Sequence, residues 1–199
     1  MIITISGTPG SGKSTVAKIL AEKLKAERIY VGGIRRDLAR EKGMTLIELN
    51  EYAKTHPETD VDVDKKAANC ARELEKKGKL VIVEGRTQFY FLPESIKVFI
   101  KVSVEEGARR IWRDLQQQKT RQARNEGKIG SLDETKKRIV NREEEDAARY
   151  KKYYGVDHRI EKQYDLVLDT IKLNQEETAD KVLDFIKIKT KKRIQKLIN

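Results

Sequence analysis

The segment Gly7-Thr8-Pro9-Gly10-Ser11-Gly12-Lys13-Ser14 decides the fold of this 199-residue chain. It matches the pattern G-x-x-x-x-G-K-[ST]. Residues 1–6 before it form an apolar run typical of a buried strand, and residues 13–25 after it have a helical pattern. A glycine-rich turn in this context lets backbone N–H groups surround phosphate oxygens, and the helix N-terminus adds partial positive charge. The segment therefore predicts a P-loop that binds a nucleoside triphosphate.

The P-loop residues have distinct expected roles toward ATP and Mg²⁺. Lys13 would reach the β- and γ-phosphates, the Ser14 hydroxyl would ligate Mg²⁺, and Thr15 would donate to the α-phosphate. Glu84 ends an apolar run over residues 79–84, where an acid faces the ligand crevice and would approach Mg²⁺ through water. The alternative for Glu84 is a carboxylate that only holds its own loop. The expected ATP-binding residues are Gly7, Thr8, Pro9, Gly10, Ser11, Gly12, Lys13, Ser14 and Thr15.

Strand-like and helix-like segments alternate along the whole chain. Further strands are expected over residues 28–31, 79–84, 96–102 and 164–169. Thr45-Leu46-Ile47-Glu48 has the spacing of a capping box, which predicts a helix that begins near Leu46. Five strands separated by helices predict an α/β fold: a five-stranded parallel sheet in a three-layer α/β/α arrangement with right-handed crossovers.

The length predicts a single domain with two insertions. Residues 32–78 and 113–150 are too long to be plain crossovers, so each is expected to close over ligands. Residues 116–130 are polar and contain two glycines, which predicts a mobile flap. The expected core comprises residues 1–31, 79–112 and 151–186, and a basic tail follows at 187–199.

The composition limits the location and the partners. Residues 185–199 carry six of the eleven net positive charges, so this end could be a solvated helix end or could bind nucleic acid. No apolar run approaches the roughly 20 residues that span a bilayer. The lone Cys70 fits a reducing compartment, and the chain opens directly into a strand without a signal sequence. A cytoplasmic monomer with nucleotide partners is expected.

Clustered arginines narrow the reaction class. A dianionic acceptor phosphate beside a triphosphate needs several fixed guanidinium groups. Arg36 and Arg86 follow predicted strands, while Arg142, Asp146 and Arg149 fall on one helical face through offsets of four and three. The chain is too short for the switch regions and base-reading N-K-x-D motif of a GTPase. These features favour a small phosphotransferase.

The chain resembles the cytidylate kinase family, especially its archaeal-type branch, over nearly all of its length up to about residue 186. The similar segments are YVGGIRRDLA at 30–39, EKGMTL at 41–46, HPETD at 56–60, VEGR at 83–86, REEEDAARY at 142–150, YGVD at 154–157 and DLVLDT at 165–170.

The resemblance implies a nucleoside monophosphate kinase that converts ATP and CMP or dCMP into ADP and the diphosphate. It implies that Arg36, Arg86, Arg142 and Arg149 hold the acceptor phosphate, and that Asp146 orients nucleotide and arginines. Lid arginines would neutralise charge on the transferring phosphoryl group; the expected ones are Arg109, Arg110 and Arg113.

Two positions depart from the family pattern and leave the acceptor base open. Gly33 stands where a small or acidic residue is common. Thr87 replaces an acid that follows the equivalent of Arg86 in bacterial members and reads the cytosine ring. Asp60, Asp62 and Asp64 offer other acceptors for an exocyclic amine, or form a solvated acidic turn. AMP, UMP or dTMP as acceptor, and a nucleic-acid-associated ATPase using the basic tail, are the alternatives.

Overall fold

The computed structural model describes residues 1–118, 122, 124, 125 and 129–198, without the side chains of 192–198. It confirms the five-stranded sheet, in which all neighbouring strands run parallel in the order β2-β3-β1-β4-β5. The elements are β1 (Ile2–Gly7), α1 (Lys13–Leu24), β2 (Glu27–Tyr30), α2 (Val31–Glu41), α3 (Leu46–Tyr52), α4 (Glu58–Lys76), β3 (Val81–Glu84), α5 (Gln88–Phe91), β4 (Ile96–Lys101), α6 (Val104–Leu115), α8 (Leu132–Tyr154), η1 (Glu161–Gln163), β5 (Leu166–Asp169) and α9 (Gln175–Ile198).

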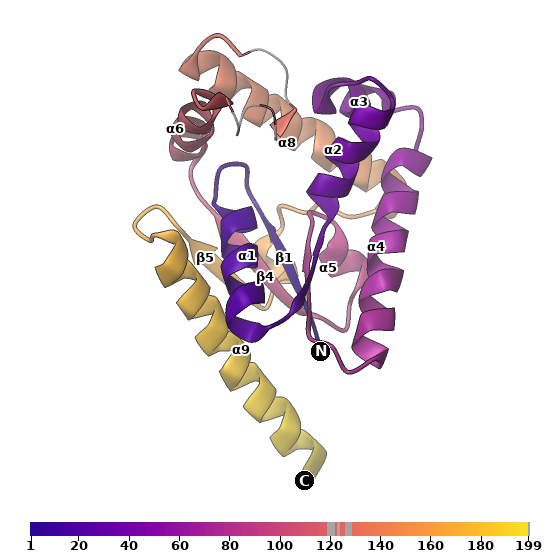
Figure 1. Ribbon diagram of the computed structural model, residues 1–199, viewed down its shortest axis with the longest axis vertical. Helices are drawn as coiled ribbons and strands as arrows, with labels where there is room; N and C mark the ends of the chain where they lie inside the picture. Colours follow the sequence, from indigo (N-terminus) through magenta and orange to yellow (C-terminus); the bar gives the residue numbers. More distant parts are fainter. Residues whose placement is uncertain (119–121, 123, 126–128, 199) are drawn as a thin grey trace.

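Helices cover both faces of the sheet, as the three-layer prediction requires (Figure 1). Because side chains alternate along a strand, Ile3 and Ile5 of β1 face one side and pack with α1 and α9, while Ile2 faces the other and packs with α4. Strands β1, β3 and β4 are buried throughout their apolar positions, which explains their continuous Val and Ile runs.

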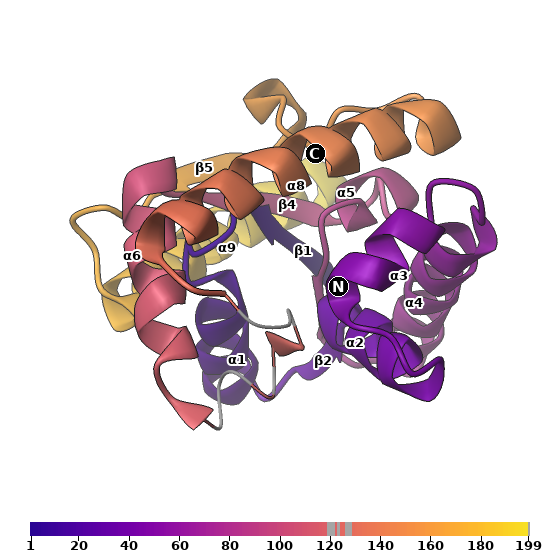
Figure 2. The same ribbon diagram turned by 90° about the horizontal axis from the view of Figure 1, so that it is seen from above.

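The remaining helices gather over the carboxyl ends of the strands. Seen from above, α6 lies on one side of this end and α2 and α3 on the other, and the long helix α8 runs across from one side to the other (Figure 2). The P-loop follows β1 at the same edge, and Gly85 and Arg86 follow β3. This is where ligands bind in open parallel sheets, because the connections that leave adjacent strands toward opposite sides of the sheet open a crevice there.

Local signals in the sequence located most helix starts. Thr45 and Glu48 form the expected capping box: the Glu48 amide donates to the Thr45 hydroxyl at 3.2 Å, and the Thr45 amide donates to the Glu48 carboxylate at 2.7 Å. At the start of α8 the Ser131 hydroxyl accepts from the Glu134 amide at 3.0 Å, and the Glu134 carboxylate accepts from the Gly130 amide at 2.7 Å. The one-turn helix α5 was not predicted, because four residues show no helical period. The expected mobile flap falls partly outside the described residues, at 119–121, 123 and 126–128.

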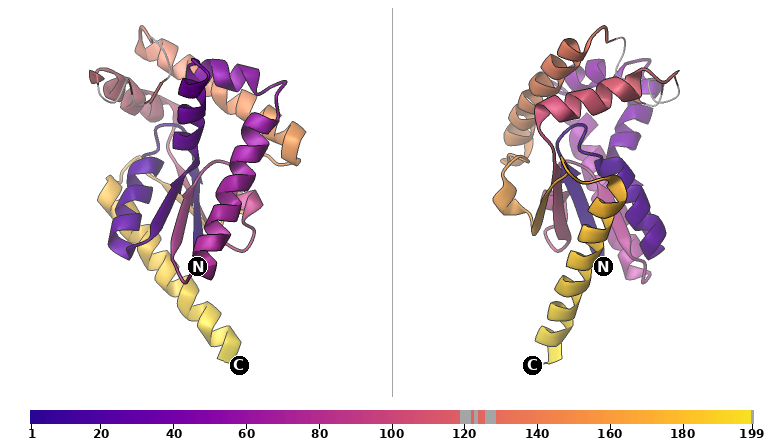
Figure 3. Two further views of the ribbon diagram at one scale, coloured as in Figure 1. Left: turned by 45° about the vertical axis from the view of Figure 1, so that its right-hand side comes forward. Right: turned by 90° about the vertical axis from the view of Figure 1, so that its left-hand side faces the viewer.

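The basic end of the chain continues α9 away from the sheet (Figure 3). Lys187 pairs with Asp184 at 3.2 Å, and Lys189 pairs with Asp165 at 2.8 Å. The side chains of Lys192, Arg193 and Lys196 lie outside the described part of the chain. Among the described residues, no helix has the length and apolar character to cross a membrane. Nucleic-acid binding by this end, the monomeric state and the cytoplasmic location stay predictions.

Close backbone contact ties the P-loop to helix α6. A Cβ atom added to Gly107 would lie 2.6 Å from the Pro9 carbonyl oxygen, and one added to Gly10 would lie 2.4 Å from the Gly107 carbonyl oxygen. No heavy atom fits at such distances, so the absence of side chains at both positions lets the start of α6 rest on the loop. The helix and the loop therefore move as one unit.

Gly107→Ala should push the loop and α6 apart. We expect a loss of about 1–3 kcal/mol in unfolding free energy, typical of overpacking, together with weaker ATP binding. Urea unfolding and nucleotide titration measure the two effects. Glu105→Ala on the same helix removes only an exposed ion pair with Lys136 and should cost less than about 1 kcal/mol. Equal effects of the two variants would contradict the close-packing argument.

Candidate functional site

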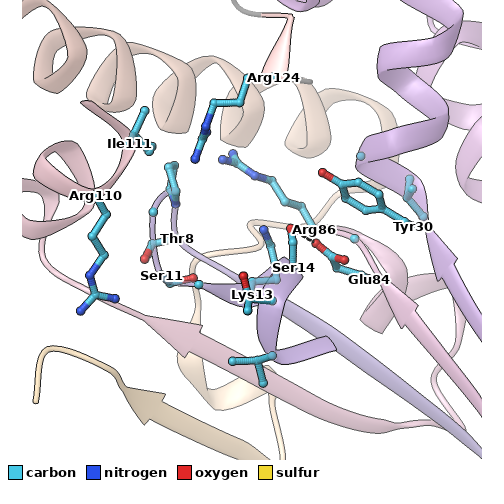
Figure 4. A pocket seen from close by; sticks show the side chains of 18 of the residues that line it. Thr8, Ser11, Lys13, Ser14, Tyr30, Glu84, Arg86, Arg110, Ile111 and Arg124 are labelled. Carbon is cyan, nitrogen blue, oxygen red and sulfur yellow. Dashed lines mark hydrogen bonds between the residues drawn. The ribbon is translucent and has the colours of Figure 1, made fainter. Parts of the chain in front are cut away.

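A cavity of about 620 Å³ opens at the carboxyl ends of the strands. It is lined by the P-loop, the ends of β2 and β3, and residues of α2, α3, α4, α6, α8 and α9. Figure 4 shows Lys13 and Ser14 on its floor, Arg110 at one end and Tyr30 at the other, with Arg86 and Arg124 between them. Segments far apart in the sequence therefore contribute to one elongated cavity.

Lys13 lies on the floor of this cavity. Desolvation lowers the pKa of Lys13 to about 8, and the positive charges of Arg86, Arg142 and Arg36 add to this effect, while Glu84 opposes it. Burial and neighbouring positive charges favour the neutral amine over the ammonium form, and here they outweigh the opposing charge of Glu84. A bound polyphosphate would reverse this balance, because its negative charge stabilises the ammonium form.

Ser14 and Glu84, the two expected metal ligands, are in direct contact. The Ser14 hydroxyl donates to one carboxylate oxygen of Glu84, and Arg28 donates to the other at 2.5 Å. Glu84 is almost completely buried. Hydroxyl and carboxylate oxygens are hard donors of the kind that suits Mg²⁺. Among the described residues no cluster of three or more His, Cys, Asp or Glu side chains could hold a metal ion, so these oxygens fit an ion held otherwise by water and nucleotide.

Alternating arginine and aspartate side chains form a series of ion pairs along the lining of the cavity. Arg86 donates to one oxygen of Asp146, and Arg149 donates to the other at 2.6 Å. Arg149 also donates to Asp60 at 2.5 Å, and Arg35 contacts the second oxygen of Asp60. We call these five residues the ion-pair chain. It links α2 and α4 to α8 and to the segment after β3.

The ion-pair chain keeps its central carboxylate charged. Burial by itself would raise the pKa of Asp146, but Arg86, Arg149 and Arg142 outweigh burial and hold this pKa well below its usual range. The second terminal nitrogen of Arg86 forms an ion pair with the Glu143 carboxylate at 2.7 Å. The arginines are thereby fixed in place before any ligand enters, so little conformational entropy is lost when an anion binds.

Tyr30 positions Arg36 and explains Gly33. The Arg36 guanidinium donates to the Tyr30 hydroxyl at 2.7 Å and to the Gly32 carbonyl at 2.9 Å. A Cβ atom on Gly33 would lie 2.6 Å from the Tyr30 ring, so a larger residue there would displace the ring. The departure from the family pattern at Gly33 thus accompanies the aromatic ring that supports Arg36.

The expected lid arginines have different positions. Arg113 lines the cavity, whereas Arg109 does not and instead pairs on the surface with Glu106. Arg110 lines the far end of the cavity. Its guanidinium donates to the hydroxyl of Thr170 at 3.3 Å and to the carbonyl oxygen of Thr170 at 2.9 Å. The three side chains therefore do not converge on one point above the P-loop.

The acidic residues at the start of α4 are also separated by the helix. Asp60 and Asp64 are buried and line the cavity, whereas Asp62 is exposed. Offsets of four place the first two on one helical face. The alternative of a solvated acidic turn is therefore wrong for Asp60 and Asp64, because both lie inside the helix and face the protein interior.

Comparison with known proteins agrees with this geometry. A family model described as an AAA domain matches residues 3–152. The chain is 40% identical to a cytidylate kinase of Methanosarcina mazei over 185 residues, which cover 90% of this chain and 93% of the relative. It is 36% identical to a cytidylate kinase of Archaeoglobus fulgidus over 197 residues, 98% of this chain and 100% of the relative.

The chain belongs to the cytidylate kinase family. Solved structures with lower identity show the same fold. A shikimate kinase from Bacteroides thetaiotaomicron has a TM-score of 0.57 at 20% identity and covers 94% of this chain and 98% of its own. An uncharacterised protein from Eubacterium ventriosum has a TM-score of 0.63 at 18% identity with the same coverage.

Three arginines that line this cavity or contact its lining residues were not predicted from the sequence of this cytidylate kinase family member. Arg28 contacts Glu84, Arg35 pairs with Asp60, and Arg124 lines the cavity and accepts from Arg36 through its carbonyl at 2.9 Å. Nothing in the sequence distinguishes Arg35 from its neighbour Arg36, because the two differ only in the direction of their side chains in the folded protein. Arg28 lies on β2 opposite Ile82, two residues before Glu84 on the neighbouring strand, and its long side chain reaches Glu84 from there.

Asp146→Asn should remove the buried carboxylate that Arg86 and Arg149 share, so that Glu143 and Asp60 are the anions that remain beside them. We expect a loss of about 3–5 kcal/mol in unfolding free energy near pH 7. Because folding depresses the pKa of Asp146, its carboxylate contributes to the free energy of unfolding above the unfolded-state pKa of about 4, and this contribution is lost as pH falls further. Urea unfolding over this range should show the difference between wild type and variant narrowing below about pH 4.

Glu144→Gln is a matched control on the same helix, since Glu144 is exposed. It should change the unfolding free energy by less than about 0.5 kcal/mol at every pH. A difference between wild type and Asp146→Asn that stays constant as pH falls would rule out the charge-based role of Asp146.

Proposed function

We propose that this protein is a nucleoside monophosphate kinase that transfers the γ-phosphoryl group of ATP to CMP or dCMP, giving ADP and CDP or dCDP. The observation that carries the proposal is the single cavity that joins a P-loop to a second, preformed set of arginines. Hydrolysis of ATP alone needs no second anion site, whereas transfer between two phosphates does. Membership of the cytidylate kinase family supports the choice of acceptor.

On the donor side, the P-loop amides and Lys13 would bind the β- and γ-phosphates. Ser14 and Glu84 would hold Mg²⁺, which supplies charge neutralisation on these phosphates when bound. We assign Arg110 to the base end of the ATP site, because it lies beside Thr170 and the start of α9 at the far end of the cavity. This replaces its expected role at the transferring group.

On the acceptor side, Arg36, Arg86 and Arg142 would clamp the monophosphate. Arg149 lies behind them, and its Nη1 is buried without a hydrogen-bond partner among the described residues. An acceptor phosphate oxygen would satisfy this donor, which would otherwise carry a desolvation cost. Arg113 and Arg124 line the opposite wall and would neutralise charge on the transferring group.

The reaction would need no general base, because the acceptor phosphate is already ionised near neutral pH. The side chains would act by holding donor and acceptor oxygens in line and by stabilising negative charge in a water-poor site. We further propose that residues 32–78 form the acceptor-binding insertion and 113–150 the lid region, which close over a core of 1–31, 79–112 and 151–186. Closure would exclude water that hydrolyses ATP.

A coupled ADP-release assay with CMP, dCMP, UMP, AMP, GMP and dTMP tests the proposal directly. We expect fast, acceptor-dependent release with CMP or dCMP and much slower release with the others. Preference for AMP, UMP or dTMP would keep the phosphotransfer assignment and overturn the acceptor. ADP release at one rate with or without any monophosphate would overturn the kinase assignment itself.

Lys13→Met should lower the transfer rate by about 1000-fold or more, because it removes the cation nearest the transferring phosphoryl group. Steady-state kinetics measures this loss, and circular dichroism should show an unchanged fold. Lys18→Met, at an exposed position on the same helix, should keep near-native turnover. Near-native turnover of Lys13→Met would contradict the assigned P-loop role.

Arg110→Ala and Arg109→Ala separate two neighbouring arginines by their position. We expect Arg110→Ala to raise KM for ATP by about 10-fold, equivalent to one lost contact, with KM for the acceptor changed less than about twofold. Arg109→Ala should leave both KM values and kcat near native. A large fall in kcat for Arg109→Ala would show that α6 turns to bring Arg109 into the site.

A further inference from the structure

The cavity holds a buried acid, Asp64, next to the residue that follows Arg86. Thr87 occupies the position after Arg86 where bacterial members carry an acid. In the structure, the Thr87 hydroxyl donates to the Asp64 carboxylate at 2.8 Å. Both residues line the same cavity as the P-loop and the acceptor arginines. The carboxylate is thus present at this end of the site, but it comes from α4 rather than from the segment after β3.

The surroundings of Asp64 keep it an acceptor. Tyr154 donates its hydroxyl to the same oxygen as Thr87 at 2.9 Å, and the Gln88 amide donates to the other oxygen at 3.0 Å. Burial raises the pKa of Asp64, and these three donors oppose that rise. A carboxyl group that accepts from three donors on both oxygens has the hydrogen-bond pattern of the ionised form.

The direction of the Thr87 hydrogen bond decides what the cavity presents. A hydroxyl has one hydrogen and two lone pairs. Since the hydrogen of Thr87 points to Asp64, its lone pairs are left for other donors. Asp64 and Thr87 therefore present hydrogen-bond acceptors, and no donor, to a ligand in the cavity. A ligand that places a hydrogen-bond donor here is favoured, and one that places an acceptor here meets like partial charges.

We propose that Asp64 and Thr87 together recognise the exocyclic amine of the acceptor base, so that they select cytosine over uracil. This inference rests on the proposed function and deepens it. Cytosine carries an amine where uracil carries a carbonyl oxygen. The cytosine amine would donate to the acceptors of Asp64 and Thr87. The uracil carbonyl oxygen, itself an acceptor, would face these two buried acceptors without a hydrogen between them.

The other two acids of this segment do not serve the same purpose. Asp60 contacts the charged guanidinium groups of Arg35 and Arg149, so its carboxylate belongs to the ion-pair chain and has no hydroxyl partner after Arg86. Asp62 is exposed on the opposite side of α4 and does not line the cavity. Only Asp64 combines burial, cavity exposure and a hydroxyl partner after Arg86.

Two substitutions test the pair, and the ratio of kcat/KM for CMP to kcat/KM for UMP is the readout. Thr87→Val keeps the shape and removes the hydroxyl; we expect the CMP:UMP ratio to fall by about 10- to 100-fold. Asp64→Asn presents an amide donor in place of an acceptor and should lower the ratio further. A purely structural role would lower both kcat/KM values together and leave the ratio unchanged, which would overturn the proposal.

Two further variants complete the experiment. Asp62→Asn makes the same chemical change on the same helix away from the cavity and should leave the ratio at its wild-type value. Thr87→Asp introduces the acid of bacterial members directly and should keep a preference for CMP. If Asp64→Asn fails to fold by circular dichroism, Thr87→Val alone decides, and an unchanged ratio in Thr87→Val overturns the proposal.

The wild-type enzyme separates this proposal from the proposed function. If the wild type phosphorylates neither CMP nor dCMP, the proposed function fails at the outset. If the wild type prefers CMP and the Thr87→Val and Asp64→Asn variants keep that preference, the proposed function stands and the assignment of Asp64 and Thr87 is wrong. The same preparations also report Mg²⁺-dependent ATP binding, which neither substitution should change by more than about twofold.

Discussion

The charge balance around Asp146 is the constraint on which the acceptor side of this protein depends. Several guanidinium groups must stand close enough to bind one phosphate, and without a ligand they repel one another. Asp146 accepts from Arg86 and Arg149 and lies beside Arg142, so a single buried carboxylate contacts three of these guanidinium groups, while Glu143 and Asp60 supply further negative charge. Burying one charge without its partner costs several kcal/mol, so these residues depend on each other for stability.

The ion-pair chain also connects parts of the fold that are expected to move. Arg35 lies on α2, Asp60 on α4, and Asp146 and Arg149 on α8, while Arg86 follows the central strand β3. A ligand that enters among these arginines therefore acts on two insertions and the sheet at once. In the absence of phosphate, burial and the neighbouring arginines also lower the pKa of Lys13 to about 8, because both disfavour its ammonium form.

The departures from the family pattern have local explanations in the structure. Gly33 leaves room for the Tyr30 ring, which supports Arg36. Thr87 is joined to Asp64, so an acid is still present near that position although it comes from another helix. A motif defined along the chain can lack a residue that another part of the folded protein supplies, as Asp64 does beside Thr87.

The amino-acid sequence by itself determined the P-loop, the parallel sheet, most helix starts and the shared helical face of Arg142, Asp146 and Arg149, because these depend on spacing within short segments. Strand, turn and helix around Lys13 are local, and so are the offsets among Arg142, Asp146 and Arg149. Only the tertiary structure decided that Arg35 rather than Arg36 faces Asp60, that Arg109 points away from the cavity, and that Asp64 meets Thr87. These depend on side-chain direction and on contacts between residues more than twenty positions apart, which no local pattern records.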